Sequence, residues 1–155
     1  MVDARPTPLF GQTVGEAQRA LRALADDVFD AAGTTFESWL VLNTLATQGP
    51  AIPGETLRRD LAYALSVPPN AVLDLIAQVE SAGYIGFNLG ASAGGQISLT
   101  PDGVDFHRRL RESIARVSAR TLAGIDPRDV ETTVNVLQTV KEQAQALRER
   151  VPAEA

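Results

Sequence analysis

Residues 60–72 read DLAYALSVPPNAV, a helical pattern that stops in a turn and then starts again. Apolar residues recur every three or four positions on both sides of the turn, as expected for two short amphipathic helices. The apolar positions are Leu57, Leu61, Leu65, Val72, Leu75, Ile76 and Val79. Pro69 suits the first turn of the second helix, where its missing N–H is not needed. The stretch therefore predicts a helix-turn-helix.

The period changes after Gly83. Residues 84–87 (Tyr-Ile-Gly-Phe) and 96–99 (Gln-Ile-Ser-Leu) read as two short strands, and residues 88–95 between them are small and flexible. This hairpin follows the helix-turn-helix directly. The middle of the chain is therefore predicted to be a winged helix-turn-helix with a two-stranded β-wing.

Longer helices flank this middle part. Two Thr-x-x-Glu capping boxes predict helix starts at Thr13 and Thr34, with stops at Gly33 and at Gly49–Pro50. Residues 52–54 (Ile-Pro-Gly) read as a connector. Two further helices are expected from Thr100 to about residue 122 and from Asp126 onward.

Each flanking helix carries one apolar seam, and such helices need a partner to be stable. The simplest partner is a second copy of the chain around a two-fold axis; the alternative is a monomer that folds these helices back on itself. The predicted fold is mainly α. It consists of N-terminal dimerisation and support helices (12–49), a winged helix-turn-helix lobe (50–100) and C-terminal dimerisation helices (101–150), in a single intertwined chain.

Composition excludes several kinds of chemistry. The 155 residues carry a net charge of −5, with no Cys, one His (His107) and one Lys (Lys141). Disulfides, thiolate metal sites and cysteine nucleophiles are excluded, a multi-histidine metal site cannot form within one chain, and no phosphate-binding loop is present. No apolar run approaches the ~18 residues that would span a bilayer. The first residues lack the basic and apolar stretches of a signal peptide, so a cytoplasmic protein is expected. No cofactor is expected.

Four local strings, in this order and spacing, resemble the MarR family of dimeric winged-helix transcriptional regulators. They are residues 60–72, 79–85 (VESAGYI), 99–103 (LTPDG) and 124–127 (GIDP). The resemblance covers residues 12–147. It implies a homodimer whose recognition helices enter successive major grooves of double-stranded DNA while the wings touch the minor groove. It also implies a small ligand, often an aromatic or phenolic acid, between the lobe and the dimerisation helices.

The positions that correspond to DNA contacts in the family carry few cations. These positions are Arg58, Arg59, Asn70, Leu73, Asp74 and Gln78. Arg58 and Arg59 would hold phosphates, and Asn70 would read a base edge. The family usually places Arg in the wing, whereas residues 86–99 contain no charged residue. Residues 50–107 hold two arginines and six acids, a net charge of −4, although phosphate contacts depend on cations.

Two functions are therefore considered. The first is a ligand-responsive regulator that binds operator DNA weakly. The second is a MarR-like dimer that no longer binds DNA and instead binds a small molecule or a protein partner, conceivably acting on the small molecule.

The resemblance also places candidate ligand contacts. These are Asp30, Trp39, Tyr63, His107 and Arg111, which suit a small aromatic or anionic ligand. Structural roles compete with this interpretation: Trp39 has the spacing of a core residue, and His107 reads as a surface or boundary residue. The arginines of residues 108–120 read as a solvated face, with Asp105–Arg109 and Glu112–Arg116 pairs. No nucleophile–base–orienter set is present, so only acid/base work by a group such as His107 would make the chain an enzyme.

Overall fold

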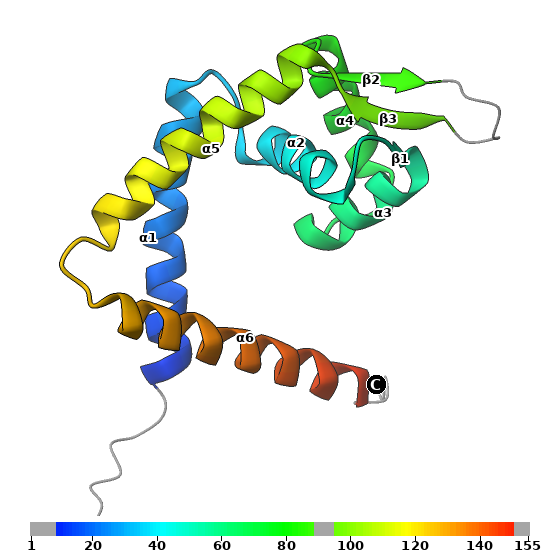
Figure 1. Cartoon of the computed structure of the whole chain (residues 1–155). Helices are drawn as coiled ribbons and strands as arrows, with labels where there is room; N and C mark the ends of the chain where they lie inside the picture. Colours follow the sequence, from blue (N-terminus) through cyan, green and yellow to red (C-terminus); the bar gives the residue numbers. More distant parts are fainter. Residues whose placement is uncertain (1–8, 89–94, 151–155) are drawn as a thin grey trace, which may run out of the picture. The chain divides into compact units, whose positions relative to one another are not determined.

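The computed structural model describes residues 9–88 and 95–150, so the predicted hairpin tip at residues 89–94 and the two chain ends lie outside the described residues. The chain divides into two compact units, residues 1–117 and 118–155. The elements are α1 (Leu9–Ala31), α2 (Phe36–Gln48), β1 (Ile52–Pro53), α3 (Gly54–Leu65), α4 (Ala71–Ser81), β2 (Ile85–Asn88), β3 (Gln96–Leu99), α5 (Pro101–Thr121) and α6 (Pro127–Arg150) (Figure 1). Within the described ranges, no helix is long and apolar enough to cross a membrane.

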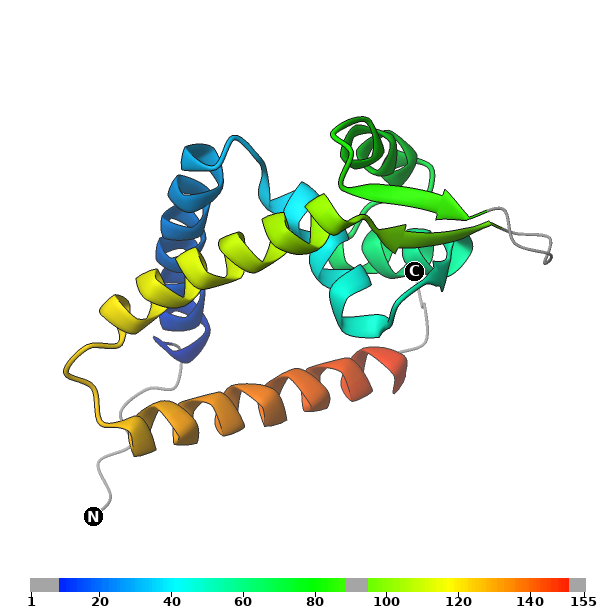
Figure 2. The ribbon, with the colours of Figure 1, turned by 45° about the horizontal axis from the view of Figure 1, so that its top comes forward.

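The lobe, here residues 36–99, contains most of the hydrophobic core. In both views, α2, α3 and α4 gather beside the small sheet (Figures 1 and 2). The buried aliphatic side chains include Val41, Leu42, Leu45, Leu57, Leu61, Val72, Ile76, Val79, Ile85 and Ile97. The helix-turn-helix seam predicted from the sequence supplies several of them. The prediction of a winged helix-turn-helix is therefore confirmed.

The wing has three strands rather than the two expected. The strand order is β1–β3–β2, with both pairs antiparallel. Ile52 and Pro53, predicted to be a connector, pair with β3, and Ile52 opposes Ile97. Pro53 is tolerated because β1 is an edge strand, where a missing N–H costs little. Two residues are too few to give a strand period, so the sequence pattern could not reveal β1.

A compact junction joins the wing to α5. The Thr100 hydroxyl donates to the Gly83 carbonyl at 2.7 Å and accepts from the Gly103 N–H at 3.0 Å. The rings of Tyr84 and Phe106 stack with centroids 4.4 Å apart. A Cβ atom added at Gly103 would lie 1.9 Å from the Tyr84 carbonyl oxygen, so only glycine fits there. Residues 99–103 (LTPDG), one of the four strings that resemble the MarR family, thus fix the exit from the wing.

The starts of α1 and α4 differ from the predictions. Helix α1 begins at Leu9, so Thr13 lies inside it, and Glu16 accepts a hydrogen bond from the Gln12 side chain rather than closing a capping box. Helix α4 begins at Ala71 after Asn70, so Pro69 lies in the turn before the helix. The predicted end at Gly33 is confirmed: its φ of 69° is in the left-handed region that glycine favours.

Helix α6 leaves its apolar seam exposed in the single chain. Asp126 caps it, since its carboxylate accepts from the Arg128 N–H at 2.9 Å. The exposed aliphatic side chains of α6 are Val134, Val136, Leu137, Val140 and Leu147. Helix α1 likewise exposes Leu21 and Leu24. These seams are available to another chain.

Candidate nucleic-acid and ligand sites

The outward face of α4 carries the predicted base-reading residues. Asn70, Leu73, Asp74 and Gln78 follow helical spacing and are all exposed. Asn70 is the N-cap residue, yet its side chain makes no capping hydrogen bond, so its amide remains available. Helix α4 contains no basic residue, and Asp74 lies in its first turn. This face offers amide donors and apolar surface but no cation.

Both arginines of α3 are paired within their own helix. Arg58 contacts the Glu55 carboxylate, and Arg59 donates to Asp60 at 3.2 Å. The hydrogen bond from Arg58 lowers the pKa of Glu55. The pKa of Asp60 is also lowered, chiefly because the Gln48 amide donates to it, with Arg59 adding to the effect. The two cations expected to hold phosphates are therefore already partly neutralised.

A cluster of aromatic rings forms where α1 meets α2. Trp39 lies 5.7 Å from both Phe29 and Phe36, measured between ring centroids. Trp39 packs against the core, as its helical spacing predicted. Its indole Nε1 is buried and lacks a hydrogen-bond acceptor among the residues described. Asp30 follows Phe29 directly and is exposed, so it lies next to this cluster in the chain.

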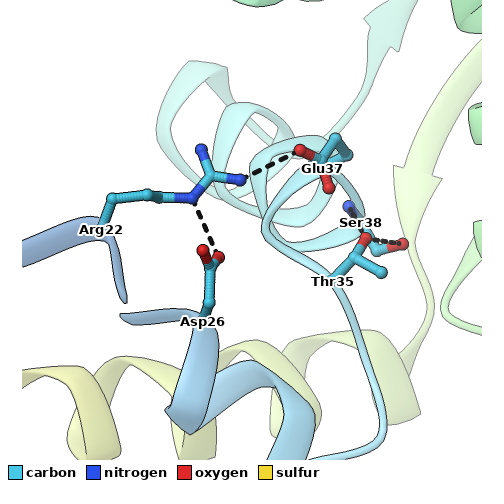
Figure 3. Close-up of polar contacts among 5 residues, drawn as sticks. All are labelled: Arg22, Asp26, Thr35, Glu37 and Ser38. Carbon is cyan, nitrogen blue, oxygen red and sulfur yellow. Dashed lines mark hydrogen bonds and ion pairs between the residues drawn. The ribbon is translucent and has the colours of Figure 1, made fainter. Parts of the chain in front are cut away.

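Polar contacts hold the same two helices together (Figure 3). Arg22 of α1 donates to Asp26 at 2.9 Å and to Glu37 of α2 at 3.1 Å. Its guanidinium also lies 3.9 Å from the centre of the Phe36 ring. The hydrogen bond to Asp26 has the largest effect on the pKa of Arg22, which it raises, and the hydrogen bond to Glu37 raises it further. Glu37, expected to reach back in a capping box, instead binds Arg22.

The N-cap of α2 is Thr35 rather than the predicted Thr34. The Thr35 hydroxyl oxygen accepts from the Ser38 N–H at 3.1 Å, as Figure 3 shows. Adjacent threonines made the two positions hard to tell apart in the sequence. The shift of one residue also explains why Glu37 is free to turn toward α1.

His107 is buried, which corrects its interpretation as a surface or boundary residue. The side chain is 7% exposed, and its Nε2 lies 3.2 Å from Oδ1 of Asn43 on α2. Burial, and to a lesser degree the nearby Arg111 charge, lower the pKa of His107. A neutral ring that carries its proton on Nε2 donates to Asn43. Asn43 was not predicted, because nothing in the sequence links it to a residue 64 positions away.

The remaining ligand candidates do not converge on one pocket. Tyr63 is exposed and lines an open pocket of about 400 Å³ together with Thr44, Gln48, Arg59 and Asp60. Arg111 is exposed on α5, one turn beyond His107. The structure therefore brings Arg111 near His107 and places Tyr63 in a different pocket, whereas Asp30 is linked to the ring cluster only by following Phe29 in the sequence.

Charge pairing on α5 also differs from the prediction. Arg108 contacts both Asp105, at 3.2 Å, and Glu112, at 3.5 Å. The expected partners were Arg109 and Arg116, but Arg116 donates to Ser113 instead. All these pairs are exposed, as a solvated face requires. The described ranges contain no group of three or more His, Asp or Glu side chains that could hold a metal ion.

Comparisons with known proteins bear on this geometry. No protein-family model matches the sequence, and no curated protein does. Solved structures match over most of the chain. MarR from Staphylococcus aureus in complex with salicylate and kanamycin has a TM-score of 0.76 at 14% identity, covering 92% of each chain.

Two further structures agree. A MarR family protein from Mycobacterium tuberculosis, in complex with p-aminosalicylic acid, has a TM-score of 0.69 at 21% identity, covering 85% of this chain and 98% of that one. A MarR family transcriptional regulator from Rhodococcus sp. RHA1 has a TM-score of 0.72 at 16% identity, covering 88% and 95%. The chain is a winged-helix protein. Its fold is that of the MarR family of transcriptional regulators, as the four sequence strings indicated.

Proposed function

We propose that the chain is a homodimeric transcriptional regulator of the MarR type that binds operator DNA through α4. The observation that carries this proposal is the match to a MarR structure across about nine-tenths of the chain. Regulation of transcription is the role printed for such neighbours. A shared fold does not by itself fix a role, so DNA binding requires its own test.

Dimerisation through the flanking helices is the first part of the proposal. The exposed seams of α1 and α6 would be covered by the same seams of a second copy. Isolated amphipathic helices are marginal in water, so this burial would stabilise α6 in particular.

DNA binding by this lobe would depend on contacts other than cations. Asn70 would read a base edge, Gln78 would add a donor, and backbone N–H groups would reach phosphates. With two paired arginines in each lobe, a dimer neutralises few phosphates. Affinity would therefore be modest and depend only weakly on salt.

The ligand in this proposal is a small aromatic or anionic molecule. Two of the similar structures hold salicylate or p-aminosalicylic acid, both aromatic acids. In this chain, the ring cluster around Trp39 would stack an aromatic ring, and Arg111 would face a carboxylate. Asp30 and His107 remain proposed ligand contacts near these residues, whereas Tyr63 would contact a ligand only in the separate pocket that it lines.

The decisive experiment is a titration of the dimer with labelled duplex from upstream of its own coding region, repeated across a salt series. Saturable binding that random duplex displaces poorly supports the proposal. Four cations per dimer predict a log–log salt slope no steeper than about −4. Asn70→Ala should weaken binding at least ~10-fold, whereas Gln143→Ala, an amide truncation on the exposed surface of α6, should not. Absence of binding at low salt by a folded dimer would contradict DNA binding at that site.

A second function is favoured by the paired arginines and the uncharged wing. In that case the chain is a MarR-like dimer that has lost DNA binding and binds a small molecule or a protein. Titrating aromatic acids while following Trp39 fluorescence separates the two functions. A ligand that binds the dimer without changing its affinity for any duplex favours the second.

A further inference from the structure

An open pocket of about 280 Å³ lies between α3, α4 and the wing. Its floor is formed by Ile76 and Ile97, which are core residues, and its walls include Leu73 and Phe87. Glu55 and Glu80 also line it. We call this site the α4–wing groove. Glu80 and Phe87 were not among the residues predicted to be functional, because neither belongs to a sequence motif that indicates a binding site.

The walls of the α4–wing groove expose large apolar side chains. Leu73 is 51% exposed and Phe87 is 45% exposed, although they belong to a lobe that buries most of its aliphatic residues. Burying a side chain of this size stabilises an assembly through the hydrophobic effect. Apolar surface that gathers around a pocket is typical of a protein-binding site.

The charge around the groove is acidic. Glu55 is paired with Arg58, but Glu80 has no ion-pair partner in the part of the chain that the structure describes. Asp74, which follows Leu73 in the sequence and does not line the pocket, adds a further carboxylate to the first turn of α4. This arrangement repels phosphate and attracts an ammonium or guanidinium group. It therefore suits a polypeptide with a basic residue better than it suits nucleic acid.

Arg58 adds an unsatisfied donor to the lining. Its Nε is buried and has no acceptor among the described residues, although its terminal nitrogen contacts Glu55. A buried donor without an acceptor destabilises the folded protein.

We propose that the α4–wing groove binds a protein segment. The segment places one large apolar side chain between Leu73 and Phe87 and a Lys or Arg against Glu80. This inference goes beyond DNA binding and does not depend on it. Because Leu73 also lies on the DNA-facing side of α4, segment and duplex would exclude one another wherever both bind.

The test uses a phage-displayed library of random 12-residue peptides, selected on the full-length protein. Selected peptides are synthesised and their dissociation constants measured by fluorescence anisotropy. We expect an apolar residue with a neighbouring Lys or Arg to be enriched. In spectra of ¹⁵N-labelled protein, the peptides should shift amide signals of α3, α4 and β2.

Variants locate the binding site. Leu73→Asp and Glu80→Lys should each weaken peptide binding at least ~10-fold, a loss of about 1.4 kcal/mol. Glu142→Lys, the same charge change on α6, should leave the dissociation constant within about two-fold. Both groove positions are exposed, and an acid at 73 suits the first turn of α4, so the variants should fold.

Three outcomes would overturn the proposal. One is that no peptide family is enriched. The second is that selected peptides bind the groove variants as tightly as the parent protein. The third is that the duplex shifts the groove amides while the peptides shift others, which would assign the groove to DNA.

Discussion

The lobe and α6 contain similar aliphatic residues but use them differently. In the lobe, Leu42, Leu57 and Val72 are completely buried by neighbouring elements. In α6, Val134 is 54% exposed, and its neighbours along the seam are exposed as well. The lobe therefore has its own core, whereas the seam of α6 still lacks a covering surface. Within a single chain, the lobe thus buries its aliphatic side chains, whereas α6 leaves its own exposed.

This difference separates two kinds of stability. Mutations in the lobe should change the free energy of unfolding directly. Mutations in the α6 seam should act through assembly and so depend on protein concentration. Four predictions, in order of decreasing effect, test the contrast.

The largest effect is expected from the double substitution Val134→Asp and Leu137→Asp. A dimer would lose four buried side chains, about 6 kcal/mol in total at about 1.5 kcal/mol each. Sedimentation should then show a monomer at concentrations where the parent protein is a dimer. The near-ultraviolet circular dichroism of the lobe, dominated by Trp39, should persist. A variant that stays dimeric would refute the assignment of α6 to the interface.

Within the lobe, Leu42→Ala should lower the free energy of unfolding by about 2–5 kcal/mol. Leu42 is completely buried, so its truncation would leave a cavity enclosed on all sides. Denaturation by guanidinium chloride at two protein concentrations measures the loss. Leu73→Ala, a similar truncation at an exposed position, is the matched control and should change stability by less than about 0.5 kcal/mol. Equal losses for the two variants would contradict the burial described here.

A smaller effect is expected at the start of α2. Thr35→Ala removes the acceptor for the Ser38 N–H and should destabilise the lobe by about 0.5–2 kcal/mol. Thr34→Ala, one residue earlier, should have little effect. Thermal unfolding of the two variants distinguishes the observed cap from the one that the sequence suggested. The opposite ranking would restore Thr34 as the cap.

The smallest effect concerns pH. The pKa of His107 is lowered in the folded protein, so the unfolded chain binds the proton more readily. The contribution of this group to stability is complete above the unfolded pKa of about 6.5 and is lost as the pH falls from there toward the folded value. Denaturant midpoints from about pH 7.5 to about pH 5 should fall less steeply for His107→Gln than for the parent protein. An unchanged slope would contradict the shift.

The sequence predicted the lobe well because its signals are local. Helical spacing, the double proline and the change of period after Gly83 are each signals within a few residues. The elements of the lobe formed where they were expected, except that β1 was missed. Beginnings of helices were predicted less well. Thr13 lies inside α1, because the preceding residues continue the helix back to Leu9.

Features that depend on distant residues were missed. His107 appeared to be a boundary residue because its partner Asn43 lies on another helix. Some local features were missed as well. Arg58 and Arg59 pair with acids close to them in the sequence, but the sequence did not show that these pairs form. The predicted DNA contacts on α4 proved to be exposed, as their role requires. Whether they bind DNA remains a prediction.

The junction at Gly103 has a mechanical consequence. With no room for a side chain against Tyr84, the first turn of α5 is locked to the base of the wing. Helix α5 has 21 residues and is therefore about 30 Å long at ~1.5 Å per residue. A tilt of about one degree at the junction moves its far end by about 0.5 Å. Because Gly103 has no side chain, the first turn of α5 packs directly against Tyr84. The helix therefore acts as a lever, and a small rotation at this junction becomes a larger displacement at its far end.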